Sequence, residues 1–284
     1  MKVKVYAKLN LTLNVTGRRN GFHDIDSLAV SVDIYDEIQA SPRSDRAVTV
    51  CGMPSVNDAD NSAYKAASAF VRAFGSCGAD ITVNKGIPFA AGMGGSSADA
   101  AAVVYCMCKL YGVDISSRKV YDLCAALGSD VNYMLRGGLG RLRGKGDDVE
   151  FYRLARPLYF ALTTFGVGIS SKEAYSAFDL LPVRQPPADN GKLLNMLTNG
   201  GANAVKLFNN HLQGAAASLS DYAREYIGFI AEHGLSANMT GSGSAYYAAF
   251  DDKTQADKTA ELLRAHGFDT VVCKTVDNGI EEVI

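Results

Sequence analysis

Glycine and serine residues run directly into an alanine-rich segment at residues 87–102, and this feature constrains the fold more than any other in the chain. The pattern predicts a tight turn followed by a helix from about Ser97 to Tyr111 that ends at Gly112. The first amides of a helix have no internal partners and carry the positive end of its dipole, so such a start binds anions. Ser96 and Ser97 can cap this helix or reach a phosphate oxygen or a metal ion. The segment is therefore either a phosphate-binding loop or a glycine turn that serine caps.

The two commonest nucleotide-binding glycine motifs are absent. A Walker loop ends in Gly-Lys-Ser or Gly-Lys-Thr, which does not occur at these glycines. The dinucleotide fingerprint is Gly-x-Gly-x-x-Gly, whereas Gly92, Gly94 and Gly95 are spaced differently. A phosphate loop in this chain would belong to another class of nucleotide-binding protein.

Composition excludes several other classes of function. The chain is 48% hydrophobic and 20% charged with a formal net charge of −2, so it offers no basic surface for nucleic acid or an anionic membrane. No apolar run is long enough to cross a bilayer, and the alternating residues 1–8 predict a strand and not a signal peptide. We therefore expect a cytoplasmic protein. The cysteines and histidines lack metal-ligand spacing, which predicts structural thiols.

Predicted strands and helices follow one another without regular alternation. Apolar periodicity predicts a strand over residues 3–15 and helices over residues 117–127 and 203–215. This irregular order favours an α+β fold, and 284 residues are enough for two domains. We expect an N-terminal domain over residues 1–155 and a C-terminal domain over residues 156–284.

Three polar residues are candidates for catalysis. Lys8 and Asn10 lie on one face of the predicted first strand, because strand side chains alternate. A lysine on a strand face is usually solvated, which is the alternative to a catalytic cation. Asp130 follows a helix-ending glycine, so its carboxylate either caps the next helix or accepts a proton from an attacking hydroxyl.

Two further segments could bind ligand. Phe22 and His23 follow a glycine turn and could stack on and hydrogen-bond a planar ring, although a lone histidine is more often structural. The second Gly/Ser turn, Gly241-Ser242-Gly243, either offers amides to a phosphate or makes a tight hairpin. Taken together, the segments supply what phosphoryl transfer requires: amides for phosphates, a cation, a carboxylate and a hydroxyl near Mg²⁺.

In this order the motifs resemble those of the GHMP kinase superfamily, which includes galactokinase, homoserine kinase and mevalonate kinase. The resemblance covers nearly the whole chain, including Ala-Lys-Leu-Asn-Leu at residues 7–11 and Leu-Gly-Ser-Asp-Val at residues 127–131. Gly-Arg-Arg-Asn-Gly-Phe-His at residues 17–23 resembles the branch that phosphorylates the 2-hydroxyl of 4-CDP-2-C-methyl-D-erythritol in non-mevalonate isoprenoid synthesis. Asn20 and Asn132 depart from that branch's motifs. The resemblance implies a two-domain α+β fold with ATP and substrate in the cleft between the domains.

The same resemblance implies a role for each candidate residue. Asp130 would be the base, and Lys8 would be the cation that activates the acceptor hydroxyl. Phe22 and Tyr175 would lie on either side of the cytosine, with His23 at its polar edge. The substrate would also contact Asn10 and Ser171. ATP would contact Asn61, Lys85, Pro88, Phe89, Ala90, Ala91, Gly92, Met93, Gly94, Gly95, Ser96, Ser97 and Ala98. Mg²⁺ would arrive with ATP, without a dedicated protein cage, and could touch Ser96 or Ser97.

Two other functions stay open at this stage. Another GHMP kinase would act on a different alcohol, such as mevalonate or homoserine, and would have no need for Phe22, His23 and Tyr175. A catalytically silent nucleotide-binding protein would bind ATP without turnover, but the chain retains both Lys8 and Asp130. The sequence does not indicate an oligomeric state.

Overall fold

The structure is a computed structural model that describes residues 1–19, 21–53, 60–166, 168–182, 184–201 and 203–283. Asn20, one of the two departures noted above, lies outside these residues. The strand β3 (Phe22–Pro42) is the centre of the sheet, because it is 21 residues long and pairs with several others. Its partners are β1 (Lys2–Asn10), β2 (Thr12–Arg19), β5 (Ala79–Asn84), β6 (Leu139–Gly144) and β12 (Thr270–Val276).

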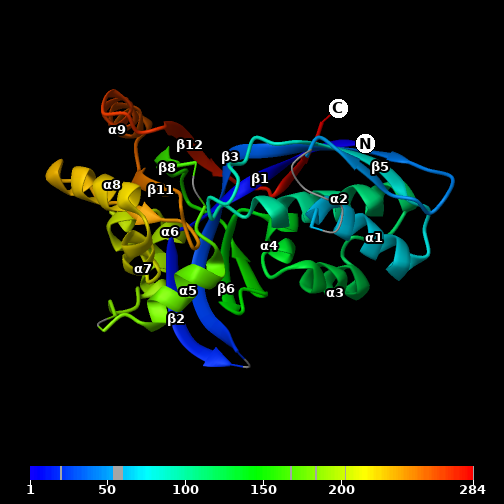
Figure 1. Ribbon diagram of the computed structural model, residues 1–284, viewed down its shortest axis with the longest axis horizontal. Helices are drawn as coiled ribbons and strands as arrows, with labels where there is room; N and C mark the ends of the chain where they lie inside the picture. The colour runs from blue at the N-terminus through cyan, green and yellow to red at the C-terminus, as the bar shows by residue number, and fades with distance from the viewer. Residues whose placement is uncertain (20, 54–59, 167, 183, 202, 284) are drawn as a thin grey trace.

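One group of helices lies under the end of the sheet that carries β1 and β5 (Figure 1). Ala63, Ala66 and Phe70 are fully buried on one face of the first helix, as the helical period requires. Its members are α1 (Ser62–Phe74), α2 (Gly95–Tyr111), α3 (Arg118–Leu127) and α4 (Val131–Arg136). The short strands here are β4 (Thr49–Cys51), β7 (Asp148–Tyr152) and β13 (Ile280–Glu282), which pairs with β1.

The second group of helices surrounds the other end of the sheet (Figure 1). Its strands are β8 (Tyr159–Thr163), β9 (Asn209–Asn210), β10 (Asn238–Met239) and β11 (Tyr246–Phe250). Its helices are α5 (Ser171–Asp179), α6 (Asn190–Asn199), α7 (Gln213–Leu219), α8 (Asp221–Glu232) and α9 (Lys253–Ala265), with a 3₁₀ turn at Ala204–Leu207. No helix of the described residues is long and apolar enough to cross a membrane.

Two hydrophobic cores correspond to these two groups. The larger lies between α1, α2 and the sheet, and the smaller lies between β11 and α7, α8 and α9. Leu162 and Tyr247 belong to the larger core, however, and Leu13 belongs to the smaller one. Because both cores draw residues from both sides of position 155, the domain boundary stays a prediction.

Two of the predicted elements are wrong. The strand over residues 3–15 is interrupted at Leu11, whose N–H donates to the carbonyl of Leu28 at 2.7 Å, and β2 then continues to Arg19. The helix over residues 203–215 is replaced by the 3₁₀ turn, β9 and the start of α7. Asn210 lies in parallel pairing with β2 and donates from Nδ2 to two carbonyls near the second glycine turn, so tertiary contacts override local helical period.

Candidate active site

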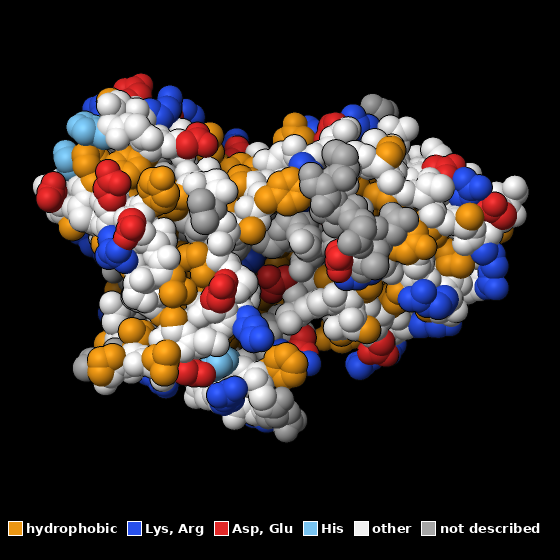
Figure 2. Space-filling model, viewed as in Figure 1, with side chains coloured by type: hydrophobic (Ala, Val, Ile, Leu, Met, Phe, Trp, Pro, Cys, Tyr) orange, Lys and Arg blue, Asp and Glu red, His pale blue; other side chains and the backbone are white. Residues whose placement is uncertain are grey.

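Two adjoining cavities open between the two helix groups. The larger has a volume of about 710 Å³ and the smaller about 290 Å³. Ser97, Ser171 and Ser242 belong to the walls of both. In the space-filling view, the face between the two groups is hollowed (Figure 2). A ligand that spans both cavities would therefore pass these three serines.

The predicted phosphate loop forms most of the wall of the smaller cavity. The residues of the loop that line it are Pro88, Phe89, Ala90, Ala91, Gly92, Met93, Gly94, Gly95, Ser96 and Ser97. Helix α2 starts at Gly95, and its N-cap is Gly94 in the left-handed region at φ 76° with no side-chain capping bond. The prediction that a serine caps this helix is thus wrong, because both serines already lie in the first turn. The first-turn amides remain available for an anion. Ala98 does not line the cavity, and its N–H is used by the Gly94 carbonyl at 2.9 Å.

The second glycine turn packs its backbone against this loop. Thr240 Oγ1 donates to the Gly92 carbonyl at 3.2 Å, and the Ala245 N–H donates to the Ala91 carbonyl at 3.2 Å. Gly92 has a φ of 74°, and a Cβ there would lie 2.2 Å from the carbonyl oxygen of Thr240. The turn is a hairpin loop between β10 and β11, and Ser242 and Gly243 also face the smaller cavity. The hairpin interpretation is thus confirmed, and the binding of a phosphate by the amides of this turn stays a prediction.

Lys8, Asn10 and Asp130 meet in the larger cavity. Lys8 is buried, and its Nζ donates to Asn10 Oδ1 at 2.5 Å and lies 3.7 Å from Asp130 Oδ2. The lysine is therefore not a solvated strand residue. Asp130 occupies the N-cap position of α4, but its side chain makes no capping hydrogen bond and is 30% exposed. Its carboxylate thus faces the cavity beside Lys8 and does not cap the helix.

A buried ionic cluster supports the entrance to the phosphate loop. Lys85 Nζ donates to Asp36 Oδ2 at 2.5 Å and to Asp99 Oδ2 at 2.9 Å. Asp36 Oδ1 also accepts the N–H groups of Gly86 and Ile87, at 2.7 and 2.8 Å. Burial raises the pKa of Asp99 above its usual range, although the charge of Lys85 opposes this. Lys85 and Asp99 line the smaller cavity, and a contact between Lys85 and ATP stays a prediction.

Asn61 is not among the described residues that line either cavity. It is buried as the N-cap of α1, where its Oδ1 accepts the N–H groups of Ala63 and Tyr64 at 2.9 and 3.3 Å. Its Nδ2 contacts the sulfur of Met53, which does line the smaller cavity. A contact between Asn61 and ATP stays a prediction.

The aromatic residues lie at the other end of the larger cavity. The rings of His23 and Tyr175 are stacked, with centroids 4.5 Å apart and planes 16° apart. His23 Nε2 pairs with Asp179 Oδ1 at 2.9 Å, and this hydrogen bond, with the charges of His23 and Arg18, holds the pKa of Asp179 below its usual range. Burial raises the pKa of Tyr175 to about 12, so its phenol stays neutral at physiological pH. Because one face of Tyr175 is covered by His23, a planar ligand would have to use the other face.

Three basic residues of this cavity were missed by the sequence analysis. Arg18, Lys145 and Lys172 line the wall, and Lys145 Nζ lies 5.9 Å from the centroid of the Phe22 ring. Lys145 lies in the turn between β6 and β7. Lysines in glycine-rich turns are common, so only the folded hairpin reveals that this one faces a ligand cavity.

Helix α5, also missed, brings Ser171 to the junction of the two cavities. Its N-cap Ser170 forms a capping box with Glu173, and Ser171 Oγ lies 3.2 Å from Ser242 Oγ. The Ser-x-x-Glu pattern of residues 170–173 was the signal that could have located this helix start. The other departure, Asn132, lies in α4 and donates from Nδ2 to the Tyr121 carbonyl at 3.2 Å, so it ties α4 to α3.

Both parts of the chain match models of the GHMP kinase family. The GHMP kinases N terminal domain matches residues 61–140, and the GHMP kinases C terminal domain matches residues 187–269. A 4-diphosphocytidyl-2-C-methyl-D-erythritol kinase of Clostridium botulinum is 30% identical over 97% of this chain and 100% of its own length. A protein of the same name from Desulfitobacterium hafniense is 33% identical over 96% of this chain and 95% of its own length.

Solved structures show the same fold. A crystal structure of 4-(cytidine 5'-diphospho)-2C-methyl-D-erythritol kinase has a TM-score of 0.80 at 29% identity and covers 96% of this chain and 98% of its own. A homoserine kinase from Cytophaga hutchinsonii has a TM-score of 0.78 at 18% identity and covers 100% of this chain and 97% of its own. The second likeness shows the fold alone. The α+β, two-domain kinase fold expected from the sequence is thus confirmed.

Proposed function

We propose a function from the premise that the chain belongs to the GHMP kinase superfamily and, within it, to the 4-diphosphocytidyl-2-C-methyl-D-erythritol kinases. On this premise it is an ATP-dependent kinase that transfers the γ-phosphate of ATP to the 2-hydroxyl of 4-CDP-2-C-methyl-D-erythritol. This reaction belongs to non-mevalonate isoprenoid precursor synthesis, and we place it in the cytoplasm. The observation that carries the proposal is the Lys8–Asp130 pair beside the phosphate loop.

We assign ATP to the smaller cavity and the acceptor to the larger one. The triphosphate of ATP occupies the smaller cavity, where the first amides of α2 and the two glycine turns surround it. The acceptor hydroxyl occupies the larger cavity beside Asp130, which accepts its proton as it attacks the γ-phosphorus. Lys8 Nζ donates hydrogen bonds to the oxygens on which negative charge develops in the transition state. Because Lys8 is buried and held by Asn10, this donor is in place before the substrate arrives.

The donor set of the smaller cavity fits a magnesium ion carried by ATP. Among the described residues, no group of three or more His, Cys, Asp or Glu side chains could hold a metal ion. Mg²⁺ prefers oxygen ligands and usually binds through phosphates, waters and one or two side chains. The hydroxyls of Ser96 and Ser97 would be its protein contacts; Asp99 lines the same cavity, and its buried Oδ1 has no hydrogen-bond partner among the described residues. When bound, the ion would neutralise charge on the β- and γ-phosphates.

The outer end of the larger cavity suits a cytidine diphosphate. Phe22, His23 and Tyr175 line this end of the cavity and offer aromatic surface for a stacked base. Arg18, Lys145 and Lys172 place positive charge along the same wall, which suits the diphosphate. Neither mevalonate nor homoserine carries a planar base for these aromatic residues.

A coupled ADP-release assay with Mg-ATP tests the proposal. The acceptors compared are 4-CDP-2-C-methyl-D-erythritol, mevalonate, homoserine and galactose, and we expect turnover with the first alone. Turnover with another alcohol would retain the superfamily and exclude the assigned substrate. ATP binding without turnover of any acceptor would identify a silent nucleotide-binding protein. Chelation of Mg²⁺ should abolish turnover, and added Mg²⁺ should restore it.

A further inference from the structure

The side-chain amide of Asn10 is held in one orientation by groups that can only donate. Its Oδ1 accepts from Lys8 Nζ at 2.5 Å and from the backbone N–H of Gly241 at 2.9 Å. An ammonium group and a backbone amide have no acceptor, so the oxygen of Asn10 must face them. Asn10 therefore joins the lysine to the second glycine turn.

Ser27 fixes the same orientation from the opposite side. Asn10 Nδ2 donates to Ser27 Oγ at 2.8 Å, and Ser27 Oγ donates to the carbonyl of Thr12 at 2.5 Å. A carbonyl can only accept, so the single hydrogen of the hydroxyl is used there. Ser27 Oγ is left to accept, which requires the NH₂ group of Asn10 and not its oxygen. Both residues are buried, so solvent does not compete for these bonds.

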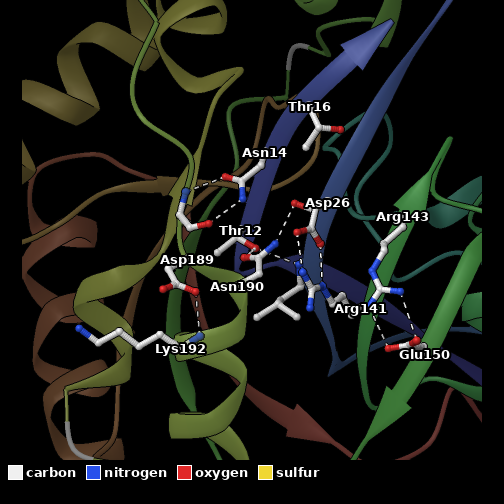
Figure 3. A network of polar contacts seen from close by, with 12 residues as sticks. Thr12, Asn14, Thr16, Asp26, Arg141, Arg143, Glu150, Asp189, Asn190 and Lys192 are labelled. Atoms are coloured by element: carbon white, nitrogen blue, oxygen red, sulfur yellow. Dashed lines mark hydrogen bonds and ion pairs between the residues drawn. The ribbon is translucent and has the colours of Figure 1, made fainter. Parts of the chain in front are cut away.

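Asn190 of helix α6 holds the side chain of Thr12, and Arg141 of strand β6 holds that of Asp26 (Figure 3). Thr12 Oγ1 donates to Asn190 Oδ1 at 2.7 Å, and Asn190 Nδ2 donates to the Asp26 carbonyl at 3.0 Å. The Asp26 carboxylate accepts two hydrogen bonds from Arg141, both at 2.8 Å. Burial opposes the charge of this carboxylate, but the hydrogen bonds from Arg141 hold its pKa below the usual range. The carbonyl that orients Ser27 therefore has little freedom to move.

We propose that Ser27 is a positioning residue for phosphoryl transfer, which sets the amide of Asn10 and through it the places of Lys8 Nζ and the Gly241 amide. The inference rests on the proposed function, because Lys8 acts on the transferred phosphate there. Without the hydroxyl, the NH₂ group of Asn10 has no acceptor and the amide can rotate. Lys8 then loses its fixed acceptor and retains Asp130, whose oxygen is 3.7 Å away.

The kinetic test compares Ser27→Ala with Ser31→Ala. Ser31 is a matched control because it is also fully buried in β3, but its Oγ accepts from the Gly138 N–H at 3.1 Å and lies 3.4 Å from Tyr133 Oη. We expect Ser27→Ala to lower kcat by about 10- to 100-fold with the KM for ATP unchanged. Ser31→Ala should keep the parent kcat even if both variants lose similar thermal stability. Ser27→Thr retains the hydroxyl and should recover most of the lost kcat.

Crystal structures of the parent, Ser27→Ala and Ser31→Ala proteins provide a readout that does not depend on turnover. We expect the Asn10 amide to leave Gly241 in Ser27→Ala and to stay in Ser31→Ala. A parent-like kcat in Ser27→Ala, or an Asn10 that keeps both contacts there, overturns the inference. If the parent phosphorylates no acceptor, the proposed function fails, and the position of Asn10 in these structures alone decides the role of Ser27.

Discussion

The two cavities of the cleft are built from different parts of the chain. The smaller is lined by two glycine turns that pack so closely that a Cβ on Gly92 would lie 2.2 Å from the Thr240 carbonyl oxygen. The larger is walled by side chains from β1, β3, α5 and the β6–β7 turn, and one of them, Phe22, is 63% exposed. All ATP-dependent kinases bind the phosphates of ATP, whereas they do not all bind a cytidine diphosphate. In the proposed function, ATP therefore binds beside the closely packed glycine turns, and the cytidyl substrate binds beside projecting side chains.

The largest effect, on kcat, should come from a change at Asp130, the proposed base. Asp130→Asn keeps the size of the side chain but cannot accept the proton, so kcat should fall by about 10²- to 10⁴-fold. The affinity for ATP, measured by calorimetry, should change little. Asp122→Asn removes an exposed carboxylate from α3 and is the matched control. Near-parent turnover in Asp130→Asn would remove this residue from the role of base.

The close packing of the two glycine turns is tested by Gly92→Ala. The added Cβ would lie 2.2 Å from a backbone oxygen, so the two turns must separate and ATP affinity should fall by roughly 10-fold or more. Gly112→Ala is the control, because that glycine also has a positive φ, 65°, but no atom lies within 4 Å of a Cβ there. Equal ATP affinities in the two variants would mean that the contact between the turns is unimportant for the nucleotide.

The assignment of the two ligands to the two cavities is tested by a pair of exposed aromatic residues. Phe22 and Phe89 are 63% and 64% exposed and line the larger and smaller cavities respectively. Stacking on a base contributes about 1–3 kcal/mol, so Phe22→Ala should raise the KM for the cytidyl substrate by roughly 5- to 150-fold. Phe89→Ala should affect only the KM for ATP. If Phe22→Ala leaves the KM for the cytidyl substrate at its parent value, the base lies elsewhere.

The smallest effect concerns Asn61, where a structural and a binding role can be separated. Asn61→Ala removes the cap of α1 and should lower stability by about 1 kcal/mol, measured by denaturant unfolding. Asn61→Asp keeps an oxygen for the cap and should keep parent stability. A higher KM for ATP in Asn61→Asp would support an ATP contact, and an unchanged KM would leave Asn61 as a cap alone.

The sequence predicted best what is local. Helix α2 follows from its alanines and its glycine boundaries, and Lys8 and Asn10 share a face because strand side chains alternate. Helices α5 and α6 were missed because they are short and largely polar, and much of their position comes from tertiary contacts. Asn190, for example, is buried only because it bonds to Thr12 and to the Asp26 carbonyl.

Residues that act through long-range contacts could not be found from spacing. Ser27 resembles any other strand serine until β1, β2 and β3 come together around it. The same holds for Lys145, which meets Phe22 only once the hairpin of β6 and β7 has formed. The predicted capping role of Ser96 and Ser97 failed because glycine in the left-handed region ends the loop and starts the helix itself.

In the proposed function, the residues of this cleft transfer a phosphoryl group from ATP to a cytidyl sugar alcohol. The most direct measurement is ³¹P nuclear magnetic resonance of the parent protein with Mg-ATP and 4-CDP-2-C-methyl-D-erythritol. We expect a new phosphomonoester signal that grows with the signals of ADP while the diphosphate of the substrate stays intact. ADP with inorganic phosphate and no phosphomonoester, or no reaction at all, would contradict the proposed function.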